Sequence, residues 1–126
     1  MMKEAIIYYS KTPHPSYNEY WDTKYHDVHF SHDDKPISLK RGFFTHYWRK
    51  LPIKEKVDSS KLRPEMERLF EKYNLYHSNP YSSENNGQHI IRDLGVHTSM
   101  SVEDIIKIGN TYYMVAPEGF RKIRFV

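Results

Sequence analysis

The stretch SKLRPEMERLFEKYN, residues 60–74, carries the clearest secondary-structure pattern in this 126-residue chain. Its apolar residues recur at intervals of four, three, one and three, and these intervals draw one stripe along a helix: Leu62, Met66, Leu69, Phe70 and Tyr73. Ser60 is a candidate N-cap, Pro64 is tolerated in a first helical turn, and Glu65 suits the positive end of the helix dipole. The stretch therefore predicts one main helix that begins near Ser59 or Ser60 and ends at Tyr73.

The final residues read as three short strands separated by turns. Residues 104–108, 111–115 and 120–126 are the expected strands, and Gly109-Asn110 and residues 116–119 supply the reversals between them. A short helix is expected before them, from about residue 84 or 88 to Leu94, with Gly95 as its left-handed cap. The C-terminal part thus predicts a three-strand meander.

Two further strands are expected in the first half of the chain. Residues 3–10 contain a β-branched and aromatic run, Ile6 to Tyr9, that is typical of a strand. Residues 40–51 alternate so that Phe43 and Tyr47 would share one face, and Pro52 is expected to end that strand.

These elements predict one α+β domain that spans residues 1–126, with a loop-rich part at 1–58 and a more regular part at 59–126. The expected sheet is small, mixed or mostly antiparallel, and its C-terminal meander packs on the one main helix. The predicted core is Ile6, Tyr8, Phe43, Tyr47, Met66, Leu69, Phe70, Ile90, Leu94, Ile105, Ile106, Tyr113, Val115, Phe120 and Ile123.

The amino-acid composition excludes several kinds of site and favours one cellular compartment. The chain has no cysteine, which excludes disulfides, cysteine nucleophiles and iron–sulfur clusters and favours a reducing compartment. Its first apolar stretch, residues 5–9, is too short for a signal-peptide core or a membrane span. We therefore expect a cytoplasmic protein with no membrane partner.

Positive charge is concentrated between residues 35 and 63, where nine Lys and Arg face only Glu55 and Asp58. Within it, residues 40–50 interleave bases with aromatic side chains, the combination that follows a phosphate backbone and stacks on bases. The candidate contacts with RNA or single-stranded DNA are Lys40, Arg41, Trp48, Arg49 and Lys50. In the alternative interpretation the aromatic residues belong to the core and the bases flank them in solvent.

A second cluster, HDVHFSHDD at residues 26–34, places His26, His29 and His32 at intervals of three. Imidazoles with nearby carboxylates are ligands for zinc and similar cations, so these three are candidate metal ligands. The alternative is a solvated polar loop, and we expect no cofactor.

Assembled catalytic motifs are absent from the sequence, because it contains no Gly-x-Ser-x-Gly, no phosphate-binding glycine loop and no His-Glu-x-x-His. An enzyme would need an unfamiliar site that uses His26, His29 or Asp104.

Four segments occur in a recognisable order: MERLFEKYN at 66–74, HTSMSVEDII at 97–106, YYMV at 112–115 and GFRKI at 119–123. Their order and spacing resemble the YodL-like domains of bacteriophages, conjugative elements and low-GC bacteria, over about half of the chain. The signature has glycine where this chain has Glu103. The resemblance implies a shared fold and a mobile-element origin, and it assigns no catalytic residue or cofactor. Ser101 and Asp104 are expected to bond backbone amides where a loop enters a strand.

We therefore expect a phage or mobile-element accessory protein that acts without catalysis, by stoichiometric binding to a macromolecule of the host or of the element. A nucleic-acid-binding module and a small enzyme with an unrecognised site are the alternatives. The net charge of +3 excludes an acidic DNA mimic.

Overall fold

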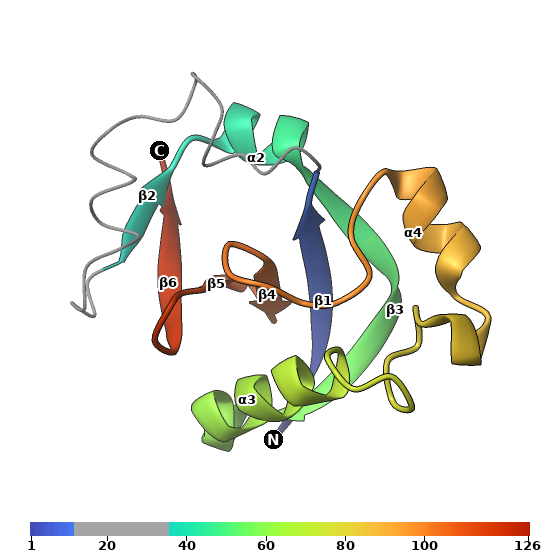
Figure 1. Cartoon of the computed structure of the whole chain (residues 1–126). Helices are drawn as coiled ribbons and strands as arrows, with labels where there is room; N and C mark the ends of the chain where they lie inside the picture. Colours follow the sequence, from blue (N-terminus) through green and yellow to red (C-terminus); the bar gives the residue numbers. More distant parts are fainter. Residues whose placement is uncertain (12–35) are drawn as a thin grey trace.

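The structure is a computed structural model that describes residues 1–11 and 36–126 (Figure 1). Its strands are β1 (Met2–Ser10), β2 (Ile37–Leu39), β3 (Trp48–Asp58), β4 (Ile105–Ile108), β5 (Thr111–Val115) and β6 (Phe120–Phe125). Its helices are α2 (Arg41–Tyr47), α3 (Leu62–Lys72) and α4 (Gln88–Leu94), with short 3₁₀ turns at Ser59–Lys61 and Ser83–Asn85.

The six strands form one mixed sheet in the order β2-β6-β5-β4-β1-β3. Every pairing is antiparallel except that of β2 with β6. The α+β class and the C-terminal meander are confirmed. Because β1 lies between β3 and β4, strands from both halves of the sequence share this sheet.

The main helix forms where the sequence predicts it, but its cap differs. Asp58 rather than Ser60 caps the first turn, because its Oδ1 accepts the amide of Ser60 at 3.0 Å and the hydroxyl of Ser60 at 2.7 Å. The Glu65 carboxylate in turn accepts the amide of Asp58 at 2.8 Å, so the helix entry is held from both sides. The short helix α4 also forms, and Gly95 ends it in the left-handed conformation with a φ of 72°.

The strand predicted at residues 40–51 is wrong over most of its length. Residues 41–47 form α2, and only from Trp48 onward does the chain extend. Pro52 does not end this strand but lies inside β3, where the pairing with β1 shifts between Tyr8 and Ile6. Proline is tolerated there because β3 is an edge strand and the bulge removes the need for an amide hydrogen.

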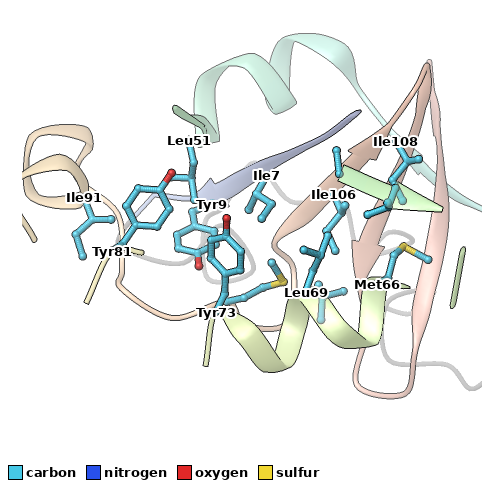
Figure 2. Packing of buried hydrophobic residues seen from close by; sticks show 14 residues of the cluster. Ile7, Tyr9, Leu51, Met66, Leu69, Tyr73, Tyr81, Ile91, Ile106 and Ile108 are labelled. Atoms are coloured by element: carbon cyan, nitrogen blue, oxygen red, sulfur yellow. The ribbon is translucent and has the colours of Figure 1, made fainter. Parts of the chain in front are cut away.

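Apolar side chains cover both faces of the sheet. On one face α3 and α4 enclose a core that includes Ile7, Tyr9, Leu69, Tyr73 and Ile106. Figure 2 shows that the rings of Tyr9, Tyr73 and Tyr81 gather in this core between the sheet and the helices. On the other face α2 packs a smaller, aromatic cluster around Phe44 and Trp48. The residues predicted for the core are all buried or half-buried.

Candidate functional site

The most site-like polar cluster surrounds Asp104, immediately before β4. Its amide bonds the carbonyl of Ser101 at 3.0 Å and closes a four-residue turn, in which Glu103 has a φ of 79°. A positive φ at the third position is the geometry of a type II turn, where glycine is usual. Glu103 thus occupies the position of this turn that requires the left-handed conformation.

The Asp104 carboxylate is fully buried and accepts several hydrogen bonds. Oδ1 accepts the amide of Ser10 at 3.0 Å, and Oδ2 accepts the amide of Ser101 at 2.8 Å and contacts Nε2 of His97 at 2.7 Å. Burial raises the pKa of the Asp104 carboxyl, while its bonds with His97, Ser10 and Ser101 act in the opposite direction. The predicted amide bonds of Asp104 are confirmed.

His97 is fixed in this cluster by stacking as well as by hydrogen bonding. Its ring lies 4.6 Å from the ring of Tyr9, with the planes only 10° apart. Tyr9 is itself buried, and its hydroxyl donates to the carbonyl of Thr98 over 3.4 Å. The cluster thereby fastens the end of β1 to the loop that leads into β4.

Ser101, His97 and Asp104 are the residue types of a nucleophilic triad, but their geometry differs from one. The Ser101 hydroxyl and the Asp104 carboxylate both approach Nε2 of His97, at 3.4 and 2.7 Å. A base relay needs the carboxylate and the nucleophile on opposite ring nitrogens, so that the ring can take a proton from one side while it is held from the other. This arrangement orients a loop and does not activate Ser101.

A second buried polar cluster joins α3 to β3. The Glu55 carboxylate is 9% exposed and lies 2.9 Å from Nζ of Lys72. The hydroxyl of Tyr73 donates to the same carboxylate at 2.7 Å, and burial raises the pKa of this phenol. Because Lys72 and Tyr73 both bond the Glu55 carboxylate, this residue holds α3 against β3 through a buried ion pair and a hydrogen bond.

The residues predicted to contact nucleic acid differ in their exposure. Trp48 is 3% exposed, packs against Phe44 and donates its indole hydrogen to the carbonyl of Glu103 at 2.8 Å. Its ring is therefore part of the core and is not available to stack on a base in this structure. The guanidinium of Arg49 lies over the end of α2, where it bonds the carbonyls of His46 and Trp48 at 2.9 and 3.0 Å.

The other three predicted contacts are exposed. Lys40 precedes α2, Arg41 lies 4.3 Å above the ring of Phe125, and Lys50 projects from the edge strand β3. Of the five predicted contacts, Lys40, Arg41 and Lys50 thus remain fully accessible to a nucleic acid.

The metal candidates His26, His29 and His32 lie outside the described residues. Among residues 1–11 and 36–126, no group of three His, Asp or Glu side chains is placed to hold a metal ion. Within these same ranges no helix has the length and apolar character needed to cross a membrane.

A pocket of about 260 Å³ lies between α3 and the turn that joins β5 to β6. Phe70, Val115 and Phe120 contribute to its apolar wall, and Arg63 and Glu67 form an ion pair of 3.3 Å at its rim. This volume is just below the usual range for small-molecule sites, about 300 to 1,000 Å³.

The loop between α3 and α4 was not among the candidate sites predicted from the sequence. It carries Leu75 and Tyr76, whose exposed fractions are 50% and 57%. The other large apolar side chains exposed in the described part of the chain are Met1, Met2 and Val126. The signal in the sequence was an aliphatic and an aromatic residue two and three positions after Tyr73, the predicted end of the helix.

Comparison with known proteins adds a viral relative. No family model matches the chain, and no solved structure matches it. The chain is 52% identical over 58 residues to the uncharacterized protein R785 of Acanthamoeba polyphaga mimivirus, a match that covers 46% of this chain. The matched region spans about half, 52%, of the length of that relative, so the chain has a viral relative over part of its sequence.

Proposed function

We propose that this chain is an accessory protein of a virus, phage or mobile element that binds a protein of its host or of the element stoichiometrically and without catalysis. The observation that carries the proposal is the exposed pair Leu75 and Tyr76 on the loop between α3 and α4. The YodL-like signature and the mimivirus relative support the origin.

The loop that carries this pair is braced from within by side-chain hydrogen bonds. Asn79 is buried, and its amide group donates to the carbonyls of Tyr73 and Thr98 at 2.9 and 3.0 Å. The Asn85 amide donates to the carbonyls of His77 and Asn79 at 3.1 and 2.8 Å. Compact surface loops that pack on their own side chains are frequently functional.

Tyr76 itself is held in place although its ring is exposed. Its hydroxyl lies 2.8 Å from Oγ of Ser83, and its carbonyl accepts the hydroxyl of Ser82 at 2.8 Å. A tyrosine that is already ordered loses little conformational entropy on binding, which favours affinity. Tyrosine is also enriched among the residues that dominate protein interfaces. The chemistry of the pair therefore fits a partner protein with an apolar pocket.

A non-catalytic role is supported by the Asp104 cluster, because its carboxylate is occupied by two backbone amides and one imidazole. A buried carboxylate in that position holds backbone and has no opening toward a substrate.

The test is affinity purification of the full chain from host cells, followed by mass spectrometry and by size-exclusion chromatography with mass measurement. We expect a partner in a fixed molar ratio that is lost from the double variant Leu75→Ser, Tyr76→Ser. The control variant Met2→Ser, Val126→Ser also removes two exposed apolar side chains and should retain the partner. Thermal unfolding establishes that both variants fold. Retention of the partner by the loop variant, or its loss from both variants alike, contradicts the proposal.

A further inference from the structure

One face of the sheet gathers lysines around tyrosines, and this gathering is not visible in the sequence. Antiparallel partners point to the same face of a sheet. The register aligns Lys54 with Ile6, Ile6 with Lys107 and Lys107 with Tyr112 across four neighbouring strands. It also aligns Lys50 with Tyr8 and Lys56 with Glu4. We call this surface the basic-aromatic face: Tyr8, Lys50, Lys54, Lys56, Lys107 and Tyr112.

The charge of this face is strongly positive. Four lysines lie on it, and the acid in the same aligned rows is Glu4, whose carboxylate is 3.6 Å from Nζ of Lys54. Lys50, Lys54 and Lys56 are exposed along the outer edge of the sheet. Neighbouring lysines two residues apart on a strand are separated by about 6.8 Å, so they present a row of charges and not a single point.

The tyrosines lie beside the lysines and are half-buried, because each ring packs on one side against Phe44, with ring centres 5.1 Å apart for Tyr8 and 5.6 Å apart for Tyr112. The rings of Tyr8 and Tyr112 are 6.0 Å apart, and Nζ of Lys107 lies 5.4 Å from the centre of the Tyr112 ring. Tyr112 also packs edge-on against Phe125 at 4.9 Å, and Arg41 covers the ring of Phe125. Cations therefore lie over two neighbouring rings, Lys107 over Tyr112 and Arg41 over Phe125.

Lysines on an edge strand have another physical role, because they prevent the edge from pairing with a second sheet. That role accounts for Lys50, Lys54 and Lys56 on β3. It does not account for Lys107, since β4 is an interior strand of the sheet, nor for the tyrosines beside it. The whole surface thus exceeds what edge protection requires.

We propose that the basic-aromatic face binds single-stranded nucleic acid, with the lysines contacting phosphates and Tyr8 and Tyr112 stacking on bases. Unlike the ring of Trp48, which is 3% exposed, the rings of Tyr8 and Tyr112 keep part of their surface in solvent. Rows of cations beside such partly exposed rings suit unpaired strands, because only an unpaired base offers its face to a side chain. The face is separate from Leu75 and Tyr76, so this inference does not rest on the proposed protein binding. Lys50 belongs to both the predicted contact set and this face.

Fluorescence anisotropy with labelled oligouridylate and oligothymidylate of about 12 nucleotides tests the proposal. We expect binding that weakens steeply between about 50 and 200 mM salt, because each displaced counterion adds to the salt dependence. The variant Lys54→Gln, Lys107→Gln should weaken binding about tenfold or more and reduce the salt slope by about 1.4. The control variant Lys61→Gln, Lys122→Gln makes the same change in charge away from the face and should bind as the unmodified chain does.

Two further variants keep the test decisive. Lys50→Gln, Lys56→Gln changes only exposed side chains, so it replaces the first variant if that one fails to fold. Tyr112→Leu preserves apolar packing and should cost about tenfold in affinity through lost stacking. Tighter binding to uridylate or to thymidylate identifies RNA or DNA as the ligand. No binding at low salt, an equal loss in the control variant, or tighter binding to a duplex of the same length would overturn the proposal.

Discussion

The indole of Trp48 donates its hydrogen to the carbonyl of Glu103 at 2.8 Å, although 55 residues separate the two in sequence. Trp48 is the first residue of β3 and Glu103 is the positive-φ residue of the turn before β4. The amide of Glu103 donates to the carbonyl of Val115 at 2.8 Å, so both backbone polar groups of Glu103 are hydrogen-bonded. This bond connects the aromatic cluster under α2 to the polar cluster around Asp104.

The substitution Trp48→Phe should therefore destabilise the protein by about 2 kcal/mol or more, because it leaves a buried carbonyl without its donor and opens a cavity. Urea unfolding followed by circular dichroism measures this change. Tyr76→Phe, which removes a hydroxyl from an exposed ring, is the control and should change stability by less than about 0.5 kcal/mol. An equal effect of the two substitutions would show that the indole bond adds nothing.

Glu103 is a buried, non-glycine residue at a φ of 79°, which places backbone strain inside a turn. Two substitutions separate this strain from the side-chain contacts. Glu103→Ala removes the side chain and keeps the strain, whereas Glu103→Gly removes both. We expect the glycine variant to be more stable than the alanine variant by about 1 kcal/mol. Equal stability of the two variants in urea would mean that the turn stores no strain.

The sequence predicts those elements whose pattern lies within a few neighbouring residues. The helix α3, the cap at Gly95 and the meander follow from spacing and turn residues within a few positions of each other. The strand prediction at residues 41–47 was wrong because alternation of aromatic residues is not specific to strands. The same segment also fits a helix, because Phe43 and Tyr47 are four residues apart and their rings lie 4.5 Å from each other.

The candidate sites were harder to predict because they depend on strand register. Asp104 and Ser10 are 94 residues apart, and Lys54 and Lys107 come together only through their shared neighbour Ile6. No local pattern specifies such pairings before the order of strands is known. The sequence therefore indicated a basic, aromatic segment but assigned Trp48 to the surface and left out Lys107 and Tyr112.

Acid should weaken the fold through Asp58. Hydrogen bonds from the side chain and amide of Ser60, with a further one from the N-terminal amine, lower the pKa of Asp58 from 3.8 to about 2. A lowered pKa means that the folded state favours the carboxylate, so this stabilisation is complete above about pH 4 and is lost as the pH falls toward 2. Urea unfolding at a series of pH values should show a shallower acid loss for Asp58→Asn than for the unmodified chain. Asp93→Asn, on the exposed side of α4, should leave the slope unchanged in that window.

Alanine in place of Gly42 would meet open space, whereas alanine in place of Gly87 would meet backbone atoms, so the two substitutions form a matched pair. A Cβ at Gly42, in α2, would have no heavy atom within 4 Å, so Gly42→Ala should stabilise the helix by about 0.5 to 1 kcal/mol. A Cβ at Gly87 would lie 2.2 Å from the carbonyl oxygen of Pro80 and 2.5 Å from Cα of Tyr81. The loop that presents Leu75 and Tyr76 must shift to admit it, so Gly87→Ala should lower stability and weaken partner binding together. Thermal unfolding and the affinity purification measure the two effects. Unchanged stability and unchanged partner binding of Gly87→Ala would show that the loop is not braced as its contacts indicate.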